Sequence, residues 1–235
     1  MADFLRLIAI LLSMFKGLGL QRRFLWAVGL LTAADLLFLG LRVIITGSGR
    51  YWFVPENLAL AWLSLGFAWL LVRNLKKQRW LSWQNLGLTA LWLLFLPNTW
   101  YVLTDFIHVY PNGEISQLFD IMLIWLLTLT GFILGITNLF IIHRQLLARR
   151  GLLNSWLFIE GAILVSSFAV YVGRDLRWNS WDIIANPSGL LFNVSDQIVD
   201  PFGSQRTLNI TLLFFILINV VYGAFWIFTY QPKRR

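Results

Sequence analysis

Residues 118–150 read LFDIMLIWLLTLTGFILGITNLFIIHRQLLARR, and this stretch contains the pattern that decides the fold. Its first 25 residues carry a single charge, Asp120, whereas three arginines occur within the last seven. A helix needs about 20 apolar residues to cross the hydrocarbon core of a bilayer. The stretch therefore predicts a transmembrane helix over 118–142 that starts near an acid and ends at a basic cluster.

Five further apolar stretches have the same character, at about 24–46, 57–72, 85–103, 153–172 and 208–230. The connections between the six stretches alternate in charge. One set is basic and holds Arg22, Arg23, Arg73, Lys76, Lys77, Arg79, Arg144, Arg149, Arg150 and the terminal Lys233, Arg234 and Arg235. The other set holds most of the acids. Because Lys and Arg collect on the cytoplasmic side of membrane proteins, the pattern predicts that both termini are cytoplasmic.

The composition agrees with an all-α, polytopic bundle of transmembrane helices. Of the 235 residues, 58% are hydrophobic and 13% are charged, against roughly 45–50% and 25% in soluble domains. The net charge of +8 comes from residues at the membrane borders. That placement favours anionic lipid over nucleic acid as the partner. The chain has no Cys, which excludes disulfides and thiolate chemistry.

Two domains of unequal size are expected. Residues 1–22 contain an apolar but short segment, which predicts an interfacial helix on the cytoplasmic side. Residues 23–235 form the domain of about six spans. Its two longer connections, 104–117 and 173–207, are expected on the outer face.

A polar stripe ends the third span. Asn98, Tyr101, Asp105 and His108 are spaced by 3, 4 and 3 residues, so on a helix they lie along one face. Pro97 precedes them and removes one backbone hydrogen bond, which predicts a kink. Irregular backbone at membrane depth is tolerated where it is buried in protein or lines a wet cavity. We therefore expect the stripe to face a cavity that opens outward.

A second polar motif follows the fifth span. Asp175, Asn179 and Asp182 are spaced by 4 and 3 residues, so a helix that continued from the span would place them on one face. Arg174 and Arg177 flank that face, and guanidinium groups bind phosphate or carboxylate bidentately.

The two motifs together define the candidate site residues. The candidates for acid or base catalysis are Asp105, His108 and Asp182. The candidates for substrate binding are Asn98, Tyr101, Arg174, Arg177 and Asn179. The candidates for ligands of a divalent cation such as Mg²⁺, Mn²⁺ or Zn²⁺ are Asp105, His108, Asp120 and Asp175. The pattern allows a metal but does not require one.

Three hypotheses follow for the function. In the first, the outer site binds an anionic headgroup or a lipid-linked phosphate, and metal-assisted hydrolysis or transfer would make the protein an enzyme. In the second, the protein is a structural or assembly partner, and Arg174 or Arg177 pairs with Asp105 or Asp120 to lock helices. In the third, it is a transporter of a small solute or ion.

The transporter hypothesis is based on charged residues inside the predicted spans. They are Asp35, Arg42 and Glu160, and charged residues within a membrane face the bundle interior. Asp35 and Arg42 are seven residues apart and share a helix face, so an internal salt bridge is the alternative explanation. Gly131 and Gly135 form a GxxxG spacing that permits close helix packing.

Both motifs resemble one family. The patterns Pro-Asn-x-x-Tyr-x-x-Thr-Asp, at residues 97–105, and Gly-Arg-x-x-Arg-Trp-Asn-Ser-Trp-Asp, at 173–182, resemble the bacterial multi-pass membrane proteins of domain of unknown function 1361. The resemblance extends from the second span to the sixth. It implies a location in the bacterial cytoplasmic (inner) membrane and implies no established activity. It also singles out the positions Asn98, Tyr101, Thr104, Asp105, Arg174, Arg177, Trp178, Asn179 and Asp182.

Overall fold

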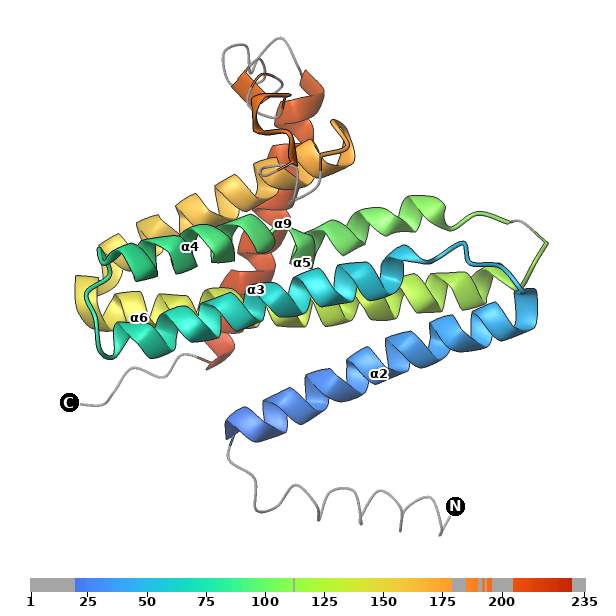
Figure 1. Ribbon diagram of the computed structural model, residues 1–235, viewed down its shortest axis with the longest axis horizontal. Helices are drawn as coiled ribbons and strands as arrows, with labels where there is room; N and C mark the ends of the chain where they lie inside the picture. The colour runs from blue at the N-terminus through green and yellow to red at the C-terminus, as the bar shows by residue number, and fades with distance from the viewer. Residues whose placement is uncertain are drawn as a thin grey trace.

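A computed structural model describes residues 20–111, 113–178, 185–189, 192, 194–195 and 205–229 (Figure 1). These residues form helices joined by short connections and contain no strand. The helices are α2 (Leu20–Thr46), α3 (Phe53–Leu75), α4 (Trp83–Phe95), α5 (Asn98–Tyr101), the 3-10 helix η1 (Val102–His108), α6 (Gln117–Arg174) and α9 (Gln205–Thr229).

Within this described part, five helical segments are long and apolar enough to cross a membrane. One of them joins α4, α5 and η1 into a single 26-residue span, Trp83–His108. The longest, α6, folds back on itself at Gly151, where φ is 77° and ψ is 179°. A positive φ of this kind is readily adopted by glycine. The two halves of α6 therefore supply two crossings, which confirms the predicted all-α membrane bundle and its six spans.

Four of the chain's turns lie at two opposite ends of the bundle (Figure 1). The 76–82 connection and the bend at Gly151 lie at one end, which we call the basic end. The 47–52 and 109–116 connections lie at the opposite end, which we call the acidic end. This arrangement follows the alternation of charge in the sequence.

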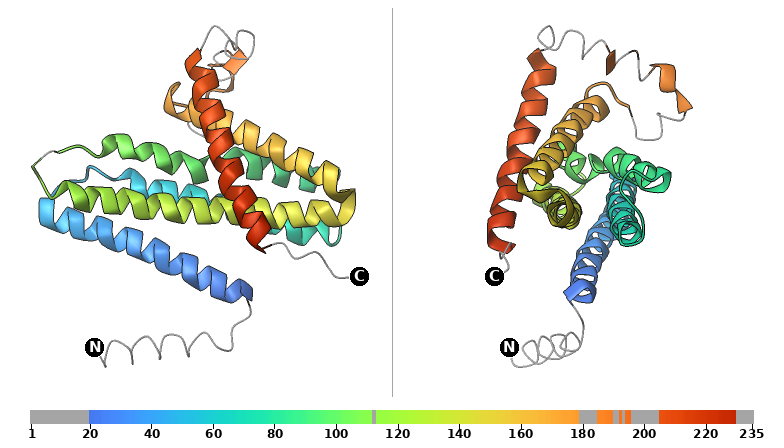
Figure 2. Two further views of the ribbon diagram at one scale, coloured as in Figure 1. Left: turned by 180° about the vertical axis from the view of Figure 1, so that it is seen from behind. Right: turned by 90° about the vertical axis from the view of Figure 1, so that its left-hand side faces the viewer.

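Helix α6 is the centre of the bundle. It contacts α2, α3, α5, η1 and α9. The first half of α6 runs beside α3, whereas its second half and α9 cross the bundle obliquely (Figure 2). Buried side chains from α3, α4, α5, both halves of α6 and α9 form the main core cluster, with Trp92, Trp100 and Tyr222 fully buried.

The GxxxG spacing in α6 brings α5 close, as the sequence predicts. A Cβ atom added at Gly131 would lie only 2.7 Å from the backbone oxygen of Thr99. One added at Gly135 would collide with the Trp100 ring. Small residues in α6 therefore set the depth at which α5 packs, and with it the position of the polar stripe.

Large apolar side chains cover much of the outer surface. Leu30 and Ile44 of α2 and Phe228 of α9 are 72%, 82% and 89% exposed. A soluble protein rarely shows so much contiguous apolar surface. Acyl chains of a bilayer would cover it.

The structure corrects one expectation about the fifth span. The helix was expected to continue from Arg174 into the outer connection, but α6 ends at Arg174 and the chain turns at residues 175–178. Arg177 has a φ of 58°, in the left-handed region that interrupts a helix. The predicted helical face is therefore interrupted at Asp175, and Asn179 and Asp182 lie outside the described residues.

The predicted interfacial helix at 1–22 falls mostly outside the described residues as well. Residues 20–22 belong to α2, which continues without a break into the first span.

Candidate functional site

A cavity of about 780 Å³ lies toward the acidic end of the bundle. Its walls come from the start of α3, from the α4–α5–η1 span, from the second half of α6 and from the turn after it. The polar or charged side chains in its lining are Arg50, Glu56, Asn57, Asn98, Tyr101, Asp105 and His108. Apolar and aromatic side chains make up the rest, so the cavity has a polar and an apolar wall.

The polar wall begins at the break between α4 and α5. Pro97 has no N–H to donate to the carbonyl of Leu93, so the helix cannot continue unchanged. Thr99 Oγ1 donates to the carbonyl of Leu96 at 2.7 Å, and Asn98 Nδ2 donates to the carbonyl of Phe95 at 3.2 Å. These local bonds satisfy backbone groups at the break and restart the helix at Asn98.

All four residues of the predicted stripe line this cavity: Asn98, Tyr101, Asp105 and His108. The chain passes from α5 into the tighter η1 between Tyr101 and Asp105. In a 3-10 helix residues three apart are eclipsed, so Asp105 and His108 lie one above the other. Trp100 and Val102 are fully buried on the opposite side.

Asp105 is the most buried polar group of the cavity. Its side chain is 4% exposed, and its Oδ2 accepts a hydrogen bond from Asn57 Nδ2 at 2.7 Å. Arg174 donates to the carbonyl of Thr104 at 3.1 Å, and its positive charge acts on Asp105 from there. No ion pair among the described residues joins Arg174 to a carboxylate, in contrast to the helix-locking interpretation.

His108 lies at the rim. Its ring centroid is 5.1 Å from that of Phe53, and its carbonyl accepts a hydrogen bond from Arg50 Nη2 at 2.7 Å. The Arg50 guanidinium also lies over the ring of Tyr110, 3.7 Å from its centroid. These two contacts fix the Arg50 guanidinium, and therefore a positive charge, at the mouth of the cavity.

Arg50 and Asn57 were not predicted as site residues from the sequence. Both come from the start of the second span and its preceding connection, and neither belongs to a spaced motif. The Pro55-Glu56-Asn57 run is the signal that was available, because two polar residues open an otherwise apolar span.

Asp120 belongs to a different cluster, which we call the Arg42 network. Arg42 Nε pairs with Asp120 Oδ1 at 2.8 Å, and its Nη2 pairs with Glu114 Oε2 at 2.8 Å. The Tyr51 hydroxyl lies 3.0 Å from Asp120 Oδ2. Burial, followed by the Asp120 carboxylate, raises the pKa of Tyr51 to about 12.

This network corrects the expected pairing inside the first span. Asp35 does not pair with Arg42. It accepts a hydrogen bond from Thr130 Oγ1 at 2.8 Å instead. Seven residues along a helix correspond to about 10 Å, which separates the two groups. Glu160 lies on the second half of α6, near the Tyr222 hydroxyl. The three charges of the transporter hypothesis thus lie in three separate surroundings.

The described part of the second sequence motif is residues 173–178, which follow the apolar wall of the cavity. Asp175 Oδ1 pairs with Arg206 Nη2 at 2.6 Å, which ties the end of α6 to the start of α9. Arg177 is exposed and Trp178 lines the cavity. Asn179 and Asp182, expected to bind substrate and to act in catalysis, lie outside the described residues.

The proposed metal ligands do not form one site in the described part of the chain. No three His, Asp or Glu side chains there come close enough to hold one ion. Asp105 and His108 share the cavity, Asp120 belongs to the Arg42 network and Asp175 pairs with Arg206.

Comparison with known families gives one match. The family described as "Protein of unknown function (DUF1361)" matches residues 56–221, which is more than half of the chain and includes most of the cavity. The chain therefore belongs to this family. No curated protein and no solved structure matches it.

Proposed function

We propose that this DUF1361 protein binds the polar headgroup of a lipid-like, amphipathic ligand in the cavity at its acidic end. One observation carries the proposal. A single cavity inside a membrane bundle joins a wall of polar groups, including Tyr101 and Asp105, to a wall of apolar groups on α6, including Phe168 and Ala169. Sites that bury most of a ligand and orient it through a few polar groups have this composition.

The polar wall supports an anionic headgroup as the ligand. Arg50 at the mouth has further N–H groups besides the one donated to His108, and guanidinium forms strong, charge-assisted bonds to phosphate. Asp105, Tyr101 and Asn98 lie on the same wall and suit hydroxyl or amide groups of the headgroup. A lipid-linked phosphate combines these features with an apolar chain for the α6 wall.

Catalysis is the second candidate, and the placement of Asp105 and His108 favours it. A buried carboxylate and an imidazole three residues apart border one cavity, which is the pairing that proton transfer to and from a bound group uses. Metal assistance draws less support, because three ligands do not converge in the described residues.

The proposal also includes an orientation. By the positive-inside rule the basic end faces the cytoplasm and the cavity faces the exported side. A reporter active only in the cytoplasm should be active when fused after Arg235, and one active only after export should be active when inserted near Gly113. The reverse result would remove the outward-facing site.

Cavity filling tests the binding proposal. The protein is purified in a neutral detergent, and lipids that co-purify are identified and counted by native mass spectrometry. Ala169→Phe places a ring in the cavity and should abolish co-purification of the ligand. The matched control is Leu164→Phe, on the same half of α6, at a side chain that is 48% exposed and does not line the cavity.

The control variant should retain the ligand. Equal retention of the ligand by both variants would contradict the proposed site. A normal elution profile and unchanged thermal unfolding of Ala169→Phe would show that the loss is not caused by misfolding.

A further inference from the structure

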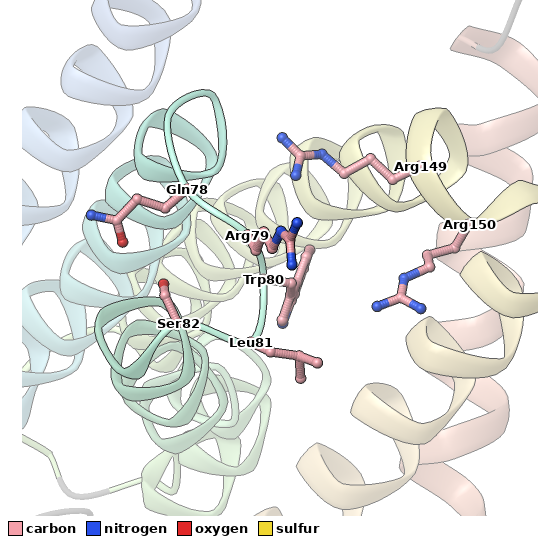
Figure 3. A pocket seen from close by; sticks show the side chains of 7 residues that line it. All are labelled: Gln78, Arg79, Trp80, Leu81, Ser82, Arg149 and Arg150. Carbon is pink, nitrogen blue, oxygen red and sulfur yellow. The ribbon is translucent and has the colours of Figure 1, made fainter.

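A second cavity, of about 740 Å³, lies at the basic end, between the 76–82 connection and the bend of α6. Figure 3 shows Arg149 and Arg150 reaching from α6 toward the connection that carries Arg79 and Trp80. Three guanidinium groups thus border one hollow from two segments that are far apart in the sequence. Gln78, Leu81 and Ser82 complete the lining.

The described residues around this cavity supply no carboxylate to its arginines. Residues 73–82 and 144–154 contain seven Lys and Arg and no Asp or Glu. The ion pairs found among the described residues involve Arg42 and Arg206, both of which belong to other parts of the bundle. Within the described part of the chain, these arginines are therefore available to an external anion.

The connection is held in place before any ligand arrives. Asn85 is fully buried, and its Nδ2 donates to the carbonyl of Arg79 at 2.9 Å. Trp80 packs edge-to-face on Phe158 of the second half of α6, with ring centroids 5.6 Å apart. Arg149 donates to the carbonyl of Leu75 and so links the first half of α6, just before its bend, to the end of α3. A preorganised site loses less free energy on ordering when it binds.

The depth of the cavity points to a lipid. It adjoins the first turn of α4, at the border of a transmembrane span. Leu81 and Trp83 beside it are 74% and 89% exposed, and Trp at such a border lies at the level of the lipid headgroups. Basic pockets between transmembrane helices bind anionic headgroups on the cytoplasmic side.

We propose that this cavity, which we call the arginine cavity, binds the phosphate of an anionic glycerophospholipid through Arg79, Arg149 and Arg150. The apolar surface of Leu81 and Trp83 takes the start of the acyl chains. This site is separate from the cavity at the acidic end and does not depend on the function proposed there.

Lipid titration tests the proposal. The full-length protein in neutral maltoside micelles is titrated with phosphatidylglycerol or with phosphatidylcholine, and bound lipid is counted by native mass spectrometry. Replacing Arg79, Arg149 and Arg150 together by Gln should weaken phosphatidylglycerol binding by about tenfold or more, which corresponds to at least ~1.4 kcal/mol. Binding of phosphatidylcholine should be weak in both proteins.

The control removes the same charge next to the cavity. Arg73, Lys76 and Lys77 lie at the same end but do not line it, and replacing all three by Gln gives the same net charge. This control should bind phosphatidylglycerol nearly as tightly as the wild type. Because Arg149 also holds Leu75, the double variant Arg79→Gln/Arg150→Gln tests binding with that contact intact.

Three results would overturn the proposal. An equal loss in the control and in the triple variant would show diffuse attraction at the basic end. Equal binding of phosphatidylcholine would remove the role of the arginines. Competition by soluble glycerol phosphate at concentrations similar to those of the lipid would assign the cavity to a soluble phosphate.

Discussion

Two clusters of buried polar groups at the acidic end differ in how their carboxylates are satisfied. In the Arg42 network, Asp120 is 1% exposed, pairs with a guanidinium and lies within hydrogen-bond distance of the Tyr51 hydroxyl. In the cavity, Asp105 is 4% exposed and its hydrogen-bond partner among the described residues is the neutral amide of Asn57. A buried ion pair locks helices together, whereas a buried carboxyl group beside a cavity, with no ion pair to another described residue, is available to a ligand.

The largest expected effect comes from breaking the Arg42 network. Arg42→Met leaves Asp120 buried without a cation, and removal of one partner of a buried pair costs roughly 3–5 kcal/mol. We expect a corresponding fall in thermal stability in detergent. Adding Asp120→Asn should restore part of it.

The control for this prediction is Arg22→Met, which removes an exposed charge at the other end of α2 and should have little effect. If Arg42→Met is as stable as Arg22→Met, the network does not lock the helices.

The second effect concerns the packing that positions the cavity wall. Gly131→Ala would place a methyl group 2.7 Å from the backbone oxygen of Thr99, and overpacking of this kind costs typically 1–3 kcal/mol. Displacement of α5 should also weaken ligand binding in the cavity. Thermal unfolding and lipid co-purification measure the two consequences.

Gly161→Ala is the matched control, because nothing lies within 4 Å of its added methyl group. Alanine favours a helix over glycine by about 1 kcal/mol, so this variant should be as stable as the wild type or more stable. Equal destabilisation by both substitutions would contradict a close contact at Gly131.

The third effect depends on pH. The pKa of Tyr51 is raised to about 12, so the unfolded chain loses this proton near pH 10 while the folded chain keeps it. Its contribution to the free energy of unfolding is complete below pH 10 and is lost as the pH rises toward 12. Tyr51→Phe should remove this part of the decline, measured by denaturant unfolding across that range. If the free energy of unfolding declined with pH in parallel for the two proteins, the pKa of Tyr51 would not be raised by folding.

The smallest effect on stability is expected in the cavity. Asp105→Asn keeps the shape and an acceptor for Asn57, and it breaks no ion pair with any described residue. We expect a change of about 1 kcal/mol or less, together with loss of ligand binding. Asp120→Asn should be far more destabilising. If Asp105→Asn unfolds as readily as Asp120→Asn, then Asp105 is structural and the comparison fails.

The spacing of residues along one helix was enough to predict part of the candidate site. Asn98, Tyr101, Asp105 and His108 were placed on one face from sequence, and all four line the cavity, because their relation depends on local helical geometry. The roles predicted for them stay predictions. The prediction that the helix continues beyond Arg174 was wrong, because α6 ends there and Arg177 has a left-handed backbone that interrupts a helix.

Partners from different helices could not be read from spacing. Arg42 pairs with Asp120, 78 residues further along the chain, although Asp35 is much nearer in sequence. Asn57 reaches Asp105 across 48 residues. These contacts depend on how α2, α3 and η1 pack on α6. The same hydropathy pattern along the chain is compatible with many such packing arrangements, so it does not predict the contacts.

The sequence by itself determined the class of the fold, the six spans and the separation of basic from acidic ends. These follow from one physical requirement, that each segment inside a bilayer be apolar and satisfy its own backbone hydrogen bonds. Only the tertiary structure decided which carboxylate is locked in an ion pair and which borders a cavity. It also decided that three arginines from two distant segments share one hollow. Contacts of side chains across helices set these features, and they depend on the depth and rotation of each helix in the bundle.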